Sequence, residues 1–277
     1  MKRSSLIILT AIITVMALSS FTYKKTIIPL GNDKGIPFFK DQMDYYVDGF
    51  DIDKDGKFYI LGGLPATLVC FNNNILQFHK KYTEFHSGQL YIYNDKLYLF
   101  DAKYRKSNIF VLNKTDGTIE KECKNISNNG INSFLFRDSS LIVEVFDDNI
   151  NLNKQLPLSY MVFDLNGKYL KHTNNIYNVP AIVNPSKKSM QYLGLWMNNF
   201  IYWDYDVDRK QYIFILKNEY GKIISSKSID EKVFGKSFYG NPIEHKKIRN
   251  GNIYILTHDY KNAIITEISI NDLFSAN

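Results

Sequence analysis

The stretch of sequence that decides the fold is GFDIDKDGKFYILGGLPATLVCFNNNILQF, residues 49–78. Its apolar runs are separated by polar turns, DKDGK before FYIL and NNN before IL. Phe58 and Ile60 alternate with Tyr59 and Leu61, which is the period of two that a β-strand requires. Asp-Gly and Asn-Asn pairs accept the positive φ angles of tight hairpins. The stretch therefore predicts four antiparallel strands, joined by a turn, a loop and a second turn.

The same unit recurs along the chain. Five first turns each precede an apolar run, namely DKDGK, YNDK, RDSS, WMNN and IRNGN, and second turns follow downstream, namely NNN, KTDG, LNGK and EYGK. Four-stranded meanders that recur about every 40–60 residues are typical of propeller blades. We therefore expect an all-β fold, a β-propeller of four-stranded antiparallel blades. The turns predict five blades, and the wider spacings around 148–190 and 229–243 leave room for a sixth.

The last repeat is incomplete, because the sequence ends soon after NAIITEISI (residues 262–270) without a fourth strand. Near the other terminus, KKTIIPL (residues 24–30) is an apolar segment that belongs to no repeat. An open sheet edge is costly to leave exposed. We therefore expect Thr26–Leu30 to supply the outer strand of the last blade and to close the ring. Pro29 lacks an amide donor, which suits an outermost strand.

Units of the form GFDIDKDGKFYI…LVCFNNNILQF resemble the blades of secreted bacterial propellers of the NHL and TolB-like superfamilies. In those blades a strand ends in an acidic turn and is followed by a Gly-Lys-Phe/Ile-Tyr-Ile strand. The resemblance covers nearly all of residues 45–270. It implies a propeller fold and suggests binding roles, but it identifies no activity, because such propellers include enzymes and scaffolds alike.

The first twenty residues have the pattern of a secretory signal. MKR is a basic start, LIILTAIITVMAL (residues 6–18) is an uncharged apolar run, and Ala17-x-Ser19 resembles a cleavage site. We expect residues 1–20 to be a signal peptide, with an uncleaved N-terminal anchor as the alternative, and residues 21–277 to be one propeller domain. The protein is then periplasmic or secreted, and an uncleaved signal would be its sole contact with a membrane.

The charge pattern bears on the partners. The net charge is +6, but the chain has five Arg against 29 Lys, and the lysines are scattered. Nucleic-acid-binding proteins concentrate Arg and Lys on one element. We therefore expect no nucleic-acid partner, a protein or glycan partner instead, and a monomer.

Cys70 and Cys123 are the two cysteines of the chain. In an exported protein an even pair can form a disulfide. Both residues lie in strand-like runs, so two buried free thiols are the competing interpretation. The sequence leaves the two alternatives open.

The acidic alternation Asp51, Asp53 and Asp55 has the look of a calcium loop. An EF-hand loop requires a bidentate Glu at its twelfth position, which here is Gly62. We interpret the segment as a hairpin turn. A second alternation is treated as a solvated loop: Asp204, Asp206 and Asp208. We expect no metal site, and calcium remains a candidate cofactor.

No known catalytic motif is present. GxSxG, GxxxxGK[ST], GxGxxG and HExxH are all absent, and the five histidines, at positions 79, 86, 172, 245 and 258, show no zinc-ligand spacing. We therefore assign no catalytic residue. Trp196, Tyr202, Trp203 and Tyr205 cluster in LWMNNFIYWDYD, where they form either core between two blades or a sugar-stacking platform.

Propeller ligands usually bind where loops open onto the central channel, beside the innermost strands. Those strands begin near five polar residues at comparable places in their repeats: Asp48, Gln89, Asn132, Gln191 and Glu244. We expect these side chains to ring one mouth of the channel. The leading hypothesis is an exported binding protein. The alternative is a lactonase-like or glycosidase-like hydrolase that uses carboxylates and calcium at this mouth.

Overall fold

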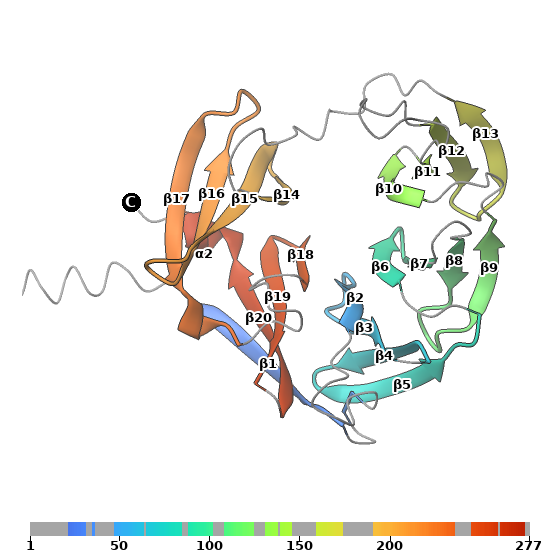
Figure 1. The fold of residues 1–277 in the computed structure, drawn as a ribbon, viewed down its shortest axis with the longest axis horizontal. Coiled ribbons are helices and arrows are strands. Elements are labelled where there is room, and N and C mark those ends of the chain that lie inside the picture. The colour runs from blue at the N-terminus through green and yellow to red at the C-terminus, as the bar shows by residue number, and fades with distance from the viewer. Residues whose placement is uncertain are drawn as a thin grey trace, which may run out of the picture.

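Five sheets stand in a ring, with β2, β6, β10, β14 and β18 nearest the centre (Figure 1). A computed structural model describes residues 22–31, 35–36, 47–63, 65–84, 88–101, 108–124, 131–137, 139–145, 159–173, 191–235, 245–259 and 261–274. Each sheet has four antiparallel strands, so the predicted five-bladed β-propeller is confirmed. Residues 1–20, the expected signal, lie outside the described residues. In the described ranges no helix is long and apolar enough to cross a membrane.

The blades follow the chain in order. Blade 1 holds β2 (Val47–Ile52), β3 (Phe58–Gly62), β4 (Thr67–Asn72) and β5 (Ile75–Lys81), and blade 2 holds β6 (Gly88–Tyr93), β7 (Lys96–Asp101), β8 (Ile109–Leu112) and β9 (Ile119–Cys123). Blade 3 holds β10 (Ile131–Arg137), β11 (Ser140–Val145), β12 (Ser159–Asp164) and β13 (Tyr169–Thr173), and blade 4 holds β14 (Gln191–Trp196), β15 (Asn199–Asp206), β16 (Gln211–Lys217) and β17 (Ile223–Asp230). Blade 5 combines β18 (His245–Arg249), β19 (Asn252–His258) and β20 (Asn262–Ser269) with β1 (Tyr23–Pro29). A short 3₁₀ helix, η1 (Glu231–Val233), follows β17, and α2 (Ile270–Phe274) follows β20.

The tight turns have the backbone conformation that their residues predict. Asn94 and Asp95, between β6 and β7, have φ angles of 45° and 60°. Asn73 and Asn74, between β4 and β5, have φ angles of 47° and 66°. Two consecutive positive φ angles are the signature of the two-residue hairpin whose twist matches that of the sheet.

The N-terminal strand closes the ring as predicted. β1 pairs with β20 in antiparallel register, from Tyr23 opposite Ile268 to Pro29 opposite Asn262. The strand is longer at its start than the predicted Thr26–Leu30, and Leu30 forms a separate bridge with Ile36. β1 is the outermost strand of blade 5, so Pro29 removes no amide from a central ladder.

Apolar side chains fill the space between neighbouring blades. Four buried clusters join blades 5 and 1, 1 and 2, 2 and 3, and 4 and 5. Trp203 and Ile201 belong to the cluster between blades 4 and 5, which supports the core interpretation of the aromatic segment. Cys70 and Cys123 are buried, free, and members of two different clusters. The free-thiol alternative is therefore the one that the structure supports.

Candidate functional site

The candidate site is a cavity of about 790 Å³ at the centre of the ring. Among the described residues, the innermost strands β2, β6, β14 and β18 all contribute to its wall. Ligand pockets commonly have volumes of about 300–1,000 Å³. The cavity therefore has the size of a small-molecule site, and it lies on the axis of the propeller.

Of the five residues predicted for the channel mouth, the structure describes the side chains of two. Asp48 in β2 and Gln89 in β6 both line the cavity. Asn132 and Gln191 lie in the innermost strands β10 and β14, but their side chains are outside the described residues. Glu244, which directly precedes β18, also lies outside them. A ring of all five side chains at one mouth remains a prediction.

Three innermost strands contain a β-bulge, which the sequence periodicity did not predict. In blade 1, Val47 pairs with Gly62 and Gly49 with Leu61, which leaves Asp48 as the extra residue of a β-bulge. Two further innermost strands have the same irregularity, with Asn132 and Leu193 as the extra residues. Bulges redirect side chains and are common beside binding sites.

Two glycines allow the innermost strands to approach one another closely. A Cβ atom on Gly49 would lie 2.8 Å from the backbone nitrogen of Leu90 in β6. A Cβ atom on Gly194 would lie 2.8 Å from Cδ1 of Ile248 in β18. All four residues line the cavity, so glycine permits a close approach of backbone to backbone at Gly49 and of a side chain to backbone at Gly194.

Burial changes the protonation of two residues in the wall. Burial raises the pKa of Asp48 to about 6, because the charged carboxylate is poorly solvated there. Burial, aided by the charges of Lys246 and Lys247, lowers the pKa of His245 to about 4. Near neutral pH Asp48 is mostly ionised and His245 is neutral.

Strand β18 brings three cations to the wall, and sequence reasoning missed them. Lys246 lies over the ring of Trp203, with its Nζ 4.6 Å from the ring centroid. Lys247 lies over the ring of Tyr91 at 3.9 Å. Arg249 donates from Nη2 to Oδ2 of Asp51 at 2.9 Å. The run HKKIR directly before a tight turn was the one local signal for this cluster.

Asp51 is fully buried behind this wall, and three hydrogen bonds hold its carboxylate. Oδ1 accepts a hydrogen bond from the amide of Ile52 at 2.8 Å. Oδ2 accepts from the amide of Ile92 at 2.7 Å and from Arg249, and Lys247 Nζ lies 3.9 Å from it. Asp51 therefore links blades 1, 2 and 5, and its burial keeps it out of reach of a ligand.

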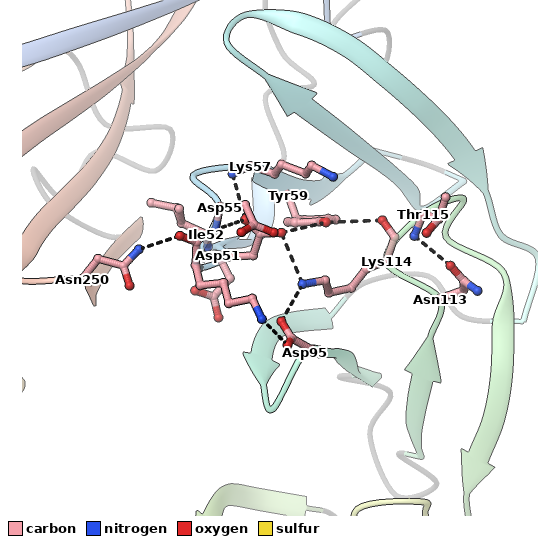
Figure 2. A network of polar contacts seen from close by, with 12 residues as sticks. Asp51, Ile52, Asp55, Lys57, Tyr59, Asp95, Asn113, Lys114, Thr115 and Asn250 are labelled. Carbon is pink, nitrogen blue, oxygen red and sulfur yellow. Dashed lines mark hydrogen bonds and ion pairs between the residues drawn. The ribbon is translucent and has the colours of Figure 1, made fainter.

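Asp53, the second acid of the alternation, is the cap of a hairpin turn. Its Oδ1 accepts from the amides of Asp55 and Lys57, each at 2.9 Å. Its Oδ2 lies 3.3 Å from the Nζ of Lys114 in blade 2, and Lys114 also pairs with Asp95 (Figure 2). The geometry supports the interpretation of this segment as a turn.

The other acidic alternation also has local partners. Oδ1 of Asp206 accepts from the amide of Arg209 at 3.0 Å, and Oδ1 of Asp204 accepts from the amide of Tyr205 at 2.8 Å. Among the residues that the structure describes, no group of three or more His, Cys, Asp or Glu side chains is placed to hold a metal ion.

Comparison with known proteins gives no family. No protein-family model matches the chain, and no curated protein matches its sequence. Virginiamycin B lyase from Staphylococcus aureus is similar in structure, with 10% identity and a TM-score of 0.48 over 89% of this chain and 100% of that one. The Dos1 propeller has 10% identity and a TM-score of 0.34 over 76% and 52%. A protein of unknown function from Bacteroides caccae has 13% identity and a TM-score of 0.34 over 68% and 69%.

At this level of similarity these neighbours identify no family and no activity. The fold rests on the five sheets themselves. The resemblance to the NHL and TolB-like superfamilies therefore stays at the level of the propeller fold.

Proposed function

We propose that this chain is an exported binding protein that takes a small ligand into its central channel. The observation that carries the proposal is the cavity of about 790 Å³ whose described wall comes from the innermost strands of four blades. Its lining combines apolar side chains such as Leu193 and Ile248 with polar and charged ones, Asp48, Gln89, Tyr91, His245, Lys246, Lys247 and Arg249. In ligand sites apolar surface supplies affinity and polar groups supply orientation, and this wall offers both.

The carboxylates favour binding over hydrolysis. Glycoside hydrolysis commonly uses two carboxylates about 5–10 Å apart across the scissile bond. Among the described residues Asp48 is the one carboxylate that lines the cavity, and Asp51 is held by two amides and Arg249. The described wall therefore offers one acid where the hydrolase alternative needs a pair.

A blocking variant tests the site. Gln89 is exposed within the channel, so Gln89→Trp places a large ring in the cavity without disturbing the core. Gln77 is exposed on the outer strand β5, and Gln77→Trp is the matched control. Thermal-shift screening of the purified chain against neutral sugars, organic acids and short peptides, followed by calorimetry, identifies a ligand. We expect Gln89→Trp to weaken its binding at least tenfold and Gln77→Trp to leave it unchanged.

Two results would contradict the proposal. One is a screen in which no compound raises the melting temperature, and the other is a ligand whose affinity is the same in both tryptophan variants. Export is tested separately, by fusing residues 1–30 to a phosphatase that is active only outside the cytoplasm. Activity that is lost when Leu6 to Leu18 is deleted supports export, and an inactive fusion contradicts it.

A further inference from the structure

We infer that the channel selects anionic ligands, namely organic monocarboxylates whose carboxylate binds beside Lys247. The inference rests on the proposed function, because it names the class of ligand for the same cavity. It follows from the charges in the wall and from the contacts of Lys247.

The described wall carries more positive than negative charge. Lys246, Lys247 and Arg249 line the cavity, and Asp48 is the acidic residue that lines it with them. Asp51 lies directly behind and neutralises one of the three cations. Summed over the described residues of the wall, with Asp48 ionised and His245 neutral, one positive charge is in excess. A partly buried net charge is unfavourable, so a ligand that carries one negative charge is electrostatically favoured.

Of the two cations that share Asp51, Lys247 is the one held less closely. Its side chain is 20% exposed, and it donates one hydrogen bond among the described residues, to the carbonyl oxygen of Leu90 at 3.2 Å. Its Nζ lies 3.9 Å from Oδ2 of Asp51, whereas Arg249 approaches the same oxygen to 2.9 Å. An ammonium group has three N–H donors. Lys247 therefore keeps donors for a ligand in the cavity.

The guanidinium of Arg249, by comparison, already donates several hydrogen bonds within the protein. Its Nη2 donates to Asp51 and to the carbonyl oxygen of Ile92 at 3.1 Å, and its Nη1 donates to the carbonyl oxygen of Ile248 at 3.3 Å. The guanidinium thus attracts a ligand carboxylate by its charge and does not form a bidentate hydrogen-bonded contact with it. One ammonium with spare donors and one excess charge suit a carboxylate. A phosphate dianion would leave a surplus negative charge in the cavity.

Asp48 and Lys247 lie at neighbouring levels of the channel. His245 at the start of β18 lies beside Val47 at the start of β2, and Arg249 at its end lies beside Asp51 near the end of β2, so the two strands run in the same direction. Lys247 then lies level with Gly49, one residue of strand, about 3.3 Å, from Asp48. A ligand whose carboxylate binds Lys247 can therefore donate hydrogen bonds to Asp48 and Gln89.

Matched probes test the inference on the intact protein. Digalacturonate monomethyl ester and a tripeptide with one free carboxylate represent the saccharide and peptide sources of such ligands, and their fully esterified or amidated forms are the neutral controls. We expect at least one free acid to bind, its neutral form to bind at least tenfold more weakly, and inorganic phosphate to compete poorly. The free acid that binds shows whether the natural ligand is of the saccharide or the peptide kind.

Lys247→Met keeps the length of the side chain and removes its charge. We expect it to weaken binding of the acid at least tenfold and to change binding of the neutral form little. Lys24→Met, on the exposed face of β1, is the control and should change neither. If Lys247→Met does not fold, the inference is still tested by comparing how tightly the natural protein binds the free acid and its neutral ester.

The possible failures are distinguishable. Equal binding of the acid and its ester, or unchanged acid binding in Lys247→Met, would overturn the charge inference and leave channel binding intact. Phosphate that binds more tightly than the carboxylate would also overturn it. If neutral and charged probes all fail to bind, and a wider screen finds no ligand that Gln89→Trp affects, the proposed function itself is wrong.

Discussion

The side chains of Asp51 and Arg249 meet at 2.9 Å although the two residues lie 198 positions apart in the chain. Asp51 is fully buried, and the side chain of Arg249 is 33% exposed. The pair joins the innermost strands of blades 1 and 5, and the amide of Ile92 adds blade 2 to the same carboxylate. A charged contact between three blades thus stabilises the wall of the channel from behind.

Replacing the buried acid tests this contact. We expect Asp51→Asn to lower the free energy of unfolding by about 3 kcal/mol, because Arg249 and Lys247 lose the charge that compensates them. Asp55→Asn, in the exposed part of the adjacent turn, should cost less than about 0.5 kcal/mol. Urea unfolding followed by tryptophan fluorescence measures both. A cost below 1 kcal/mol for Asp51→Asn would show that the ion pair contributes little.

Ring closure predicts a contrast between two neighbouring residues of β1. Ile28 is fully buried in the cluster between blades 5 and 1, whereas Ile27 is 50% exposed. We expect Ile28→Ala to cost about 2–4 kcal/mol of unfolding free energy, and Ile27→Ala less than about 1 kcal/mol. Thermal and urea denaturation of the two variants measure the difference. Similar costs for the two would mean that β1 does not pack as an integral strand of blade 5.

The glycines of the channel wall predict graded costs. In Gly49→Ala the new methyl group meets the backbone of Leu90, so strands β2 and β6 have to separate. In Gly194→Ala it meets the flexible end of Ile248, which can rotate away. We expect a cost of about 2–3 kcal/mol for Gly49→Ala and about 1 kcal/mol for Gly194→Ala. Denaturation curves measure both, and the reverse order would argue against the close approach of β2 and β6.

The cysteines predict slow thiol chemistry in the folded protein. Burial raises the pKa of Cys70 to about 11 and that of Cys123 to about 12, so little thiolate is present at pH 8. We expect neither thiol to react with an aromatic disulfide reagent in the native state, and both to react in 6 M guanidinium. Reaction of fewer than two thiols after unfolding without reductant would indicate a disulfide.

His245 predicts a pH dependence of stability. Its pKa in the folded protein is about 4, below the ordinary value of 6.5, so folding disfavours its protonation. The stability it contributes is complete above pH 6.5 and is lost as the pH falls towards 4. Relative to His245→Gln, the natural protein should lose about 2 kcal/mol between pH 7 and 4, because this histidine retains some contact with water.

Asp48 predicts a change of stability with pH in the opposite direction, and it serves as the control. Its pKa is raised from 3.8 to about 6, so the stability that it contributes is complete below pH 3.8 and is lost as the pH rises through 6. Relative to Asp48→Asn, the natural protein should therefore become less stable between pH 4 and 7, by about 1 kcal/mol. Urea unfolding across this pH range measures both variants. Parallel slopes for the two comparisons would contradict the assignments.

The elements that the sequence predicts correctly depend on local signals. Asn94 and Asp95 mark a hairpin by their own tolerance of positive φ, whatever they pack against. The closing strand was predictable because the last repeat lacked a partner and one apolar segment was unassigned. Asp48 and Gln89 line the cavity because the start of an innermost strand occupies a fixed place in each repeat, and their contact with a ligand stays a prediction.

What the sequence did not reveal depends on the register between blades. HKKIR is almost wholly polar, as a solvated strand would be, and only the approach of β18 to β2 places Lys247 and Arg249 against Asp51. Asp51 itself reads as one acid of an exposed turn, yet it is fully buried. Such burial is set by residues on another blade, which no local pattern contains.

The pairing of β1 with β20 also constrains how the protein is made. Synthesis on the ribosome delivers Tyr23 long before its partner Ile268. The fifth blade therefore has no complete sheet until β20 has emerged, and until then the hydrogen-bonding edge of β1 is open to other chains. Slow completion of this last blade makes the nascent chain dependent on whatever shields β1 in the meantime.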